Sequence, residues 1–187
     1  MPEKQHTPDE SLQQEFNRWA EAGEGEKMEN HHLNITEKTL RHMNLRPGER
    51  VLDLGCGSGA AAYYLASRCS TIEIVCVTNS SVQAEICRRK FAKLGKRAQV
   101  IVADFDSLVL DDESFDAIYS LESIGYTKDL DAWLRRCWAM LKPGGRLVLP
   151  LGPADDQQLT VIDKDAVGQT RTRDLIPVRF SLLETVI

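Results

Sequence analysis

Residues 51–59 read Val-Leu-Asp-Leu-Gly-Cys-Gly-Ser-Gly, and this stretch decides the fold of the chain. An apolar run that carries one acid, Asp53, ends at three glycines on alternate positions, and an Ala-rich stretch from Ala60 to Arg68 follows. This order predicts a strand, a tight turn and a helix, which together present backbone N–H groups to a nucleotide-like ligand. The glycines allow positive φ angles and let a ligand approach the backbone closely.

The turn fits two classes of nucleotide-like ligand, and the acids around it separate them. The spacing of Gly55, Gly57 and Ala60 satisfies the dinucleotide pattern GxGxxG/A, which also needs an acid about 20 residues later for a ribose hydroxyl. The second predicted strand, 72–77, ends instead in Thr-Asn-Ser. Asp53 would repel a pyrophosphate but suits an ammonium group. S-adenosylmethionine, which has an amino acid end and no phosphate, is therefore favoured over NAD.

The stretch resembles the DxGxGxG fingerprint of class I S-adenosylmethionine-dependent methyltransferases. Further segments resemble the strands of that family in order: 49–54, 100–103, 114–119 and 141–149. The resemblance implies an α/β, Rossmann-like fold, a mostly parallel seven-stranded sheet with helices on both faces and the last strand antiparallel. The alternative is a Rossmann-like domain that binds no cofactor.

Composition is that of one ordinary globular domain. Of the 187 residues, 42% are hydrophobic and 27% are charged, and the net charge of −5 offers no basic field for nucleic acid. The five cysteines show no CxxC pair and no neighbouring His, which indicates free thiols, a cytoplasmic location and no metal site. No apolar run reaches membrane length and no signal-peptide pattern is present. The oligomeric state does not follow from the sequence.

The first part of the chain reads as two amphipathic helices, 8–22 and 34–43. A turn at 46–48 separates them from the alternating strands and helices. We therefore divide the chain into an N-terminal helical lid or substrate segment, 1–47, and a cofactor-binding domain, 48–187.

The pattern changes after Pro150. Residues 159–163 and 175–183 read as strands around a polar connection that contains Gly168, which predicts a hairpin-like close of the sheet. The segment 145–184 resembles the end of protein-L-isoaspartate methyltransferases, although the body lacks that family's Glu-Ile-Gly-Thr-Gly and Ser-Gln-Pro segments. The chain is either a natural member with a shared ending or a recombined or engineered chimera.

The resemblance to methyltransferases assigns the cofactor contacts. Asp53 is expected to bind the methionine amino group, directly or through water. The stretch from Thr78 to Gln83 resembles cyclopropane-fatty-acid synthases, tocopherol methyltransferases and terpenoid C-methyltransferases, in which both residues would hold the ribose by neutral hydrogen bonds. The alternative is a helix cap by Ser80 or Ser81, and both readings are compatible.

The third strand leads to two further cofactor candidates. Asp104 stands where the family's acid meets the adenine amino group, and Phe105 either stacks on the base or joins the core. Cys56 is interpreted as a small turn residue rather than a nucleophile, because nothing beside it lowers a thiol pKa. The predicted cofactor-binding set is Asp53, Gly55, Cys56, Gly57, Ser58, Gly59, Thr78, Asn79, Gln83, Asp104, Phe105 and Leu121.

Three residues are candidates for catalysis, two of them in the loop after the fourth strand. The loop 120–126 resembles the Ser-x-Glu-Ser-x-x-His loop of the same subgroup and should border the transferred methyl. Glu122 is a base, a stabiliser of a cationic intermediate, or an acceptor that orients the loop. Tyr126 replaces His and so removes a group that titrates near neutrality. His31, near the expected lid, is either catalytic or a surface residue.

These assignments predict an enzyme that transfers methyl from S-adenosylmethionine to a small-molecule or lipid-like acceptor and releases S-adenosylhomocysteine. Three alternatives stay open at this point. They are repair of isoaspartate in proteins, a cofactor-binding scaffold without turnover, and an NAD oxidoreductase.

Overall fold

The computed structural model describes residues 30–94, 98–121, 123–153 and 155–179. The predicted helix over 8–22 and the residue Glu122 lie outside this part of the chain. The elements are α2 (Asn30–Met43), β1 (Arg50–Leu54), α3 (Ala60–Arg68), β2 (Glu73–Thr78), α4 (Ser81–Lys93), β3 (Gln99–Val102), β4 (Phe115–Tyr119), the 3-10 helix η1 (Ile124–Tyr126), α5 (Leu130–Met140), β5 (Leu141–Leu151), β6 (Gln157–Lys164) and β7 (Thr170–Val178).

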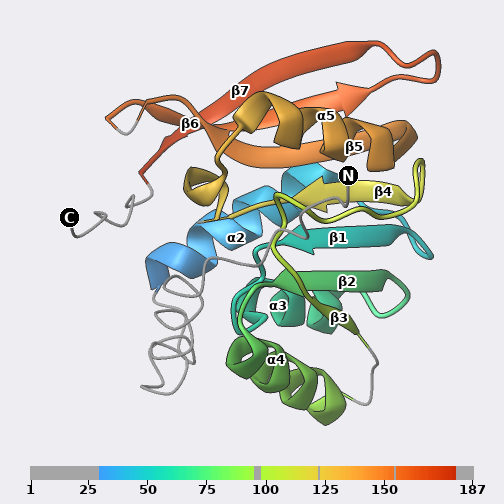
Figure 1. Cartoon of the computed structure of the whole chain (residues 1–187), viewed down its shortest axis with the longest axis vertical. Coiled ribbons are helices and arrows are strands. Elements are labelled where there is room, and N and C mark those ends of the chain that lie inside the picture. Colours follow the sequence, from blue (N-terminus) through green and yellow to red (C-terminus); the bar gives the residue numbers. More distant parts are fainter. Residues whose placement is uncertain (1–29, 95–97, 122, 154, 180–187) are drawn as a thin grey trace, which may run out of the picture.

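The seven strands form one sheet in the order β3-β2-β1-β4-β5-β6-β7 (Figure 1). The first five pair in parallel, whereas β6 runs antiparallel to both β5 and β7. The prediction of a mostly parallel seven-stranded sheet with an antiparallel end is confirmed. Among the residues described between Leu151 and Thr170, no helix separates β5, β6 and β7, so the end of the sheet is a meander of two antiparallel connections.

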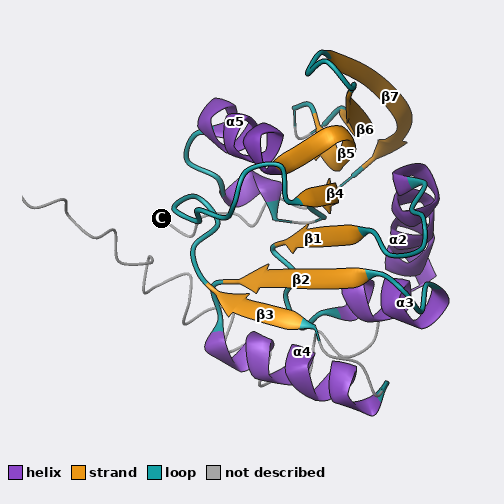
Figure 2. Ribbon diagram, turned by 90° about the vertical axis from the view of Figure 1, so that its right-hand side faces the viewer, coloured by secondary structure: helices purple, strands orange, loops and turns teal. Residues whose placement is uncertain are grey.

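Helices cover both faces of the sheet, as predicted, with α2 and α3 on one side and α5 on the other (Figure 2). The side chains of β1 alternate between these layers. Val51 packs with the core under α2, α3 and α4, whereas Leu52 and Leu54 pack with the core under α5. The side chains of Val51, Leu52 and Leu54 are all buried, so the end of β1 is packed on both faces of the sheet.

Side-chain caps fix where two of the helices begin. The Ser80 hydroxyl accepts a hydrogen bond from Gln83 N, which selects Ser80 over Ser81 as the cap of α4. The Asp129 carboxylate accepts from Ala132 N at 2.9 Å and so caps α5. The two caps place the segments that follow β2 and β4, which border the edge of the sheet described below.

The last strand begins earlier than the sequence pattern indicates. β7 starts at Thr170 rather than at residue 175. The reason is a tight turn in which the Asp165 carboxylate accepts hydrogen bonds from the backbone N–H groups of Val167 and Gln169, while Gly168 takes a φ of 80°. The polar residues after this turn therefore belong to an exposed edge strand rather than to a connection.

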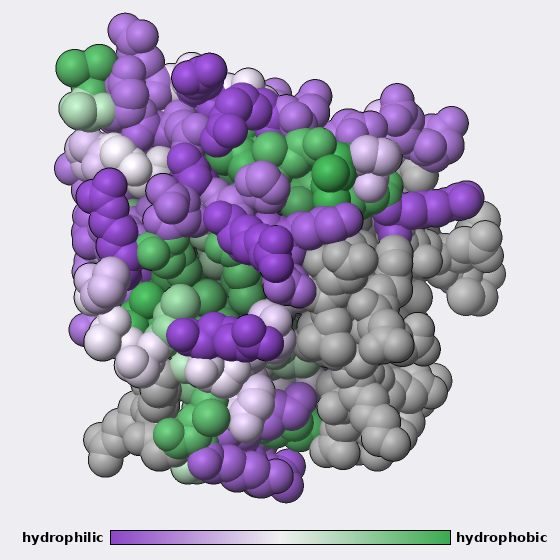
Figure 3. Space-filling view, turned by 180° about the vertical axis from the view of Figure 1, so that it is seen from behind, coloured by the Kyte–Doolittle hydropathy of each residue, from purple (hydrophilic) through white to green (hydrophobic). Residues whose placement is uncertain are grey.

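The surface mixes charge with small apolar areas. Seen from behind, charged and polar side chains are interleaved with separate apolar patches (Figure 3). Within the described ranges, no helix is both long and apolar enough to cross a membrane.

Candidate functional site

The carboxyl ends of β1 to β4 meet at one edge of the sheet, where open α/β sheets hold their ligands. The glycine turn that follows β1 is anchored there to the neighbouring strand. Backbone N–H groups of Gly55 and Cys56 both donate to the carbonyl of Val77, at 3.0 and 2.8 Å. At the far side of the turn, Gly59 precedes α3 with a φ of 76°. The predicted strand, turn and helix are therefore confirmed.

Two glycines of the turn are required by their neighbours as well as by their backbone angles. A Cβ at Gly55, whose φ is 82°, would collide with the side chain of Ser123. A Cβ at Gly59 would collide with the sulfur of Cys87. Both sites also have positive φ angles, which other residues adopt at a cost. The turn thus packs directly against the loop after β4 and against α4.

Asp53 lies at this edge and is 2% exposed. The Tyr119 hydroxyl, from the neighbouring strand β4, donates a hydrogen bond to its Oδ2 at 2.7 Å. Burial raises the pKa of Asp53 to about 7, although the Tyr119 hydrogen bond acts to lower it. Sequence reasoning missed Tyr119, because its approach to Asp53 depends on the register in which β1 pairs with β4.

The end of β2 brings together the two residues predicted to hold a ribose. Thr78 Oγ1 donates to Gln83 Oε1 at 2.8 Å and accepts from Ser80 N at 3.3 Å. Thr78 is buried, and the neighbouring Asn79 is half-buried. The Gln83 amide nitrogen is within 3.9 Å of the position that a Cβ on Gly57 would take. The pair therefore stands beside the glycine turn, and its contact with a ribose stays a prediction.

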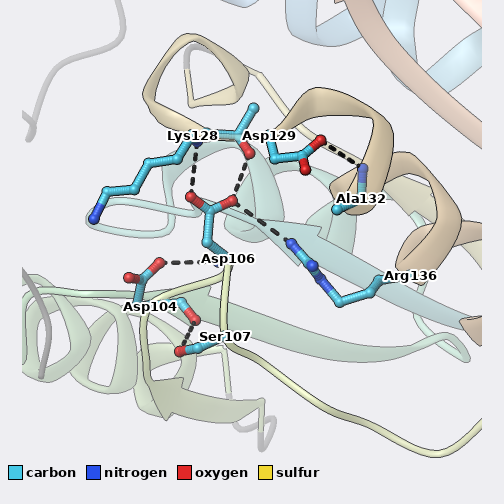
Figure 4. A network of polar contacts seen from close by, with 8 residues as sticks. Asp104, Asp106, Ser107, Lys128, Asp129, Ala132 and Arg136 are labelled. Atoms are coloured by element: carbon cyan, nitrogen blue, oxygen red, sulfur yellow. Dashed lines mark hydrogen bonds and ion pairs between the residues drawn. The ribbon is translucent and has the colours of Figure 1, made fainter. Parts of the chain in front are cut away.

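The loop after β3 is built on two acids (Figure 4). Asp104 Oδ1 accepts a hydrogen bond from Asp106 N at 2.9 Å. The Asp106 carboxylate then accepts from Thr127 Oγ1 and from Lys128 N, and Arg136 lies 3.6 Å from it. This network joins the loop after β3 to the segment before α5, and it fixes Asp104, the predicted adenine contact.

Phe105 follows Asp104 and packs inward. Its ring meets Trp133 of α5 edge to face, with centroids 6.4 Å apart. This is the core role that the sequence also allowed, while stacking on a base stays a prediction.

Two serines hold the loop after β4 against the turn. Ser123 Oγ donates to the carbonyl of Leu54 at 2.7 Å, and the hydroxyls of Ser120 and Ser123 are 2.6 Å apart. Both serines are buried. They were not among the predicted site residues, although the Ser-x-x-Ser spacing was visible.

The candidate catalytic residues are placed only in part. Leu121 and Tyr126 are both half-buried in this loop, and Tyr126 ends η1. Glu122 lies outside the described residues. His31 belongs to the first turn of α2, and its side chain is also outside the described part. Their catalytic roles stay predictions.

Cys56 and Ser58 occupy the turn with different partners. Ser58 is buried and its hydroxyl accepts a hydrogen bond from Lys90 Nζ at 3.1 Å. Hydrogen bonding with Cys76 and Cys87 raises the pKa of Cys56 well above its usual value, and burial raises it further. This fits a turn residue rather than a nucleophile. Hydrogen bonds with the other two thiols, together with the charges of Lys90 and Arg88, instead lower the pKa of Cys87.

Residues 51–145 match a family described as "Methyltransferase domain". Phosphoethanolamine N-methyltransferase 1 of Arabidopsis thaliana is 32% identical over 117 residues, which cover 63% of this chain and 24% of that protein. Protein-L-isoaspartate O-methyltransferase 1 of Polaromonas sp. is 34% identical over 146 residues, covering 76% of this chain and 57% of that protein. The chain thus spans between a quarter and somewhat over half of these relatives.

A solved geranyl diphosphate methyltransferase, in complex with GPP and sinefungin, shares the fold. Its TM-score is 0.60 and its sequence identity 26%, and the match covers 64% of this chain and 44% of that one.

Proposed function

Because the chain belongs to the family of class I S-adenosylmethionine-dependent methyltransferases, we propose that it transfers the cofactor's methyl group to a small-molecule or lipid-like acceptor. The observation that carries the proposal is Asp53, a buried carboxylate directly before a glycine turn. It suits the cofactor's ammonium group, while the end of β2 offers neutral groups where a dinucleotide site needs an acid.

In this proposal, different residues at the carboxyl edge of the sheet bind different parts of the cofactor. Asp53 binds the amino group, the Thr78–Gln83 pair faces the ribose and Asp104 meets the adenine amino group. Methyl transfer is a displacement in line with the sulfonium, so alignment of the two reactants and exclusion of water account for most of the acceleration. The loop 120–126 is the segment best placed to align the acceptor, since Ser123 seats it on Gly55.

Small-molecule acceptors are supported by two relatives whose names state them, phosphoethanolamine and geranyl diphosphate. The runner-up is methylation of isoaspartate in proteins. It is favoured by the 34% identity to an isoaspartate methyltransferase and by the similar C-terminal segment. A chain that binds the cofactor without turnover is the third reading.

Isothermal titration with S-adenosylhomocysteine tests the cofactor site. At pH 8, above the pKa of about 7 of Asp53, we expect micromolar binding that Asp53→Asn weakens by at least about tenfold, because an ammonium loses its charged partner. Asp116→Asn is the matched control, since this acid of β4 contacts Arg50 N and Lys142 Nζ instead of the turn. Absence of binding to the unmodified chain would refute the proposal.

Turnover with labelled S-adenosylmethionine then separates the acceptors. Label transferred to a pool of small molecules or lipids supports the proposal, whereas transfer to an isoaspartyl peptide alone favours repair. Binding of the cofactor with no transfer to either class identifies the third reading.

A further inference from the structure

Three cysteines that are far apart in the sequence meet beneath the glycine turn. Cys56 lies on the turn, Cys76 in β2 and Cys87 in α4, and their sulfur atoms are all within 4.8 Å of one another. Cys76 and Cys87 are fully buried, whereas Cys56 is partly exposed. Spacings of 20 and 11 residues along the chain hid this cluster from the sequence analysis.

Each of the three cysteines is carried by backbone that the fold holds in place. Cys56 N is bonded to Val77 O at 2.8 Å, and Cys76 pairs with Asp53 on one side and with Val100 on the other. Cys87 packs against Gly59, which has no room for a Cβ. The sulfurs therefore converge because of the way the sheet and α4 pack.

We propose that Cys56, Cys76 and Cys87 bind one soft, thiophilic cation of the class of Zn²⁺ or Cu⁺. Sulfurs at about 2.3 Å from a tetrahedral zinc are about 3.8 Å apart. The three sulfur–sulfur distances, all within 4.8 Å, therefore exceed those of a zinc site by no more than about 1 Å. Three sulfur ligands without imidazole favour soft cations over Mg²⁺ or Ca²⁺.

Charges act on the cluster from two sides: two cations lie beside Cys87, whereas Asp53 raises the pKa of Cys56 and Cys76. Lys90 and Arg88 act electrostatically on Cys87. Both are anchored nearby, Lys90 to Ser58 Oγ at 3.1 Å and Arg88 to Val100 O at 3.0 Å. Three thiolates around a divalent cation leave one negative charge, which these two side chains offset. The site is independent of whether the chain transfers methyl groups.

Cadmium titration of the full chain, reduced by a non-thiol reductant and freed of metal by a chelator, tests the proposal. Cd²⁺ is a soft cation whose bonds to thiolates absorb in the ultraviolet. We expect this absorption to saturate at about one equivalent and to be reversed by excess Zn²⁺. Cys56→Ser and Cys87→Ser should each weaken binding by roughly tenfold or more, since even loss of an outer-shell partner costs that much.

Cys69→Ser is the matched control, because Cys69 caps the end of α3 outside the cluster and should leave the titration unchanged. Circular dichroism verifies that each variant is folded, and the partly exposed Cys56 provides the test if Cys87→Ser does not fold. A reduced chain without thiolate absorption would overturn the proposal. So would a Cys56→Ser variant that titrates like the unmodified chain, or loss of the absorption in Cys69→Ser.

Discussion

Asp53→Asn should change how the stability of the protein depends on pH. In the folded chain, burial raises the pKa of Asp53 from 3.8 to about 7, so the fold favours the protonated carboxyl. Between these values the unfolded chain has lost its proton while the folded chain keeps it, and the free energy of unfolding therefore falls as pH rises. Each pKa unit is worth about 1.4 kcal/mol, and with both ends of the range partly titrated this gives a fall of about 3 kcal/mol from pH 4 to pH 7.

The titratable groups around Asp53 also contribute to the pH dependence of stability, so the contribution of Asp53 has to be separated from theirs. They are the Tyr119 hydroxyl on β4, which bonds it, and the thiols of Cys76, Cys56 and Cys87. The lowered pKa of Cys87 contributes to stability with the opposite sign, since its thiolate is favoured in the fold. Because Cys87 also raises the pKa of Asp53 electrostatically, only the part of its contribution that does not depend on Asp53 cancels in the difference between the unmodified chain and Asp53→Asn.

Urea unfolding followed by circular dichroism between pH 4.5 and 8, with a chelator and a reductant present, measures that difference. The stability of the unmodified chain relative to Asp53→Asn should decline through this range and level off above pH 7. In a Tyr119→Phe background the pKa of Asp53 should rise further, because a hydrogen bond that favours the carboxylate is lost, and the decline should still be in progress at pH 8. A difference that is constant with pH would refute the assignment.

Further substitutions test the packing of the site and of the sheet, each by urea unfolding. Gly55→Ala should lower the free energy of unfolding by about 3 kcal/mol or more, because a positive φ and a collision with Ser123 combine. Gly168→Ala, which has a positive φ but open space around it, should lower it by only about 1–2 kcal/mol. Equal losses in the two variants would contradict the steric argument. Ser80→Ala should lower the free energy of unfolding by about 1 kcal/mol by removing the cap of α4. An unchanged urea midpoint would show that this cap does not stabilise the protein. Lys164→Met should cost roughly 1–3 kcal/mol, since its buried ammonium bonds two carbonyls at the end of α5, and a gain in stability would show that hydrophobic packing outweighs those bonds.

Much of the parallel sheet could be predicted because its signals are local. The alternation of Val51, Leu52 and Leu54 between two cores and the stop at Gly55 follow from the pattern of apolar residues and glycine. The helix 60–68 was predicted with its observed bounds. The start of β7 was missed because Asp165 closes a turn by its side chain, and apolar periodicity carries no signal for such a bond.

The site was predictable where residues follow one another and hidden where strands bring them together. Motif spacing found Asp53 and the glycines. It did not find Tyr119, whose contact with Asp53 crosses 66 residues of chain. Nor did it find the approach of Cys76 and Cys87 to Cys56, because such contacts depend on sheet register and helix packing, which linear spacing does not encode.

The meander at the end of the sheet also bears on the order of folding. The β6–β7 pairing closes at Lys164 and Thr170, six positions apart, whereas β1 meets β4 through Val51 and Ala117, 66 positions apart. Short loops lose less chain entropy on closure and form sooner. We therefore expect the C-terminal hairpin to nucleate early and the β1–β4 junction to form late. The edge that carries Asp53 and the glycine turn is then among the last parts of the molecule to be assembled.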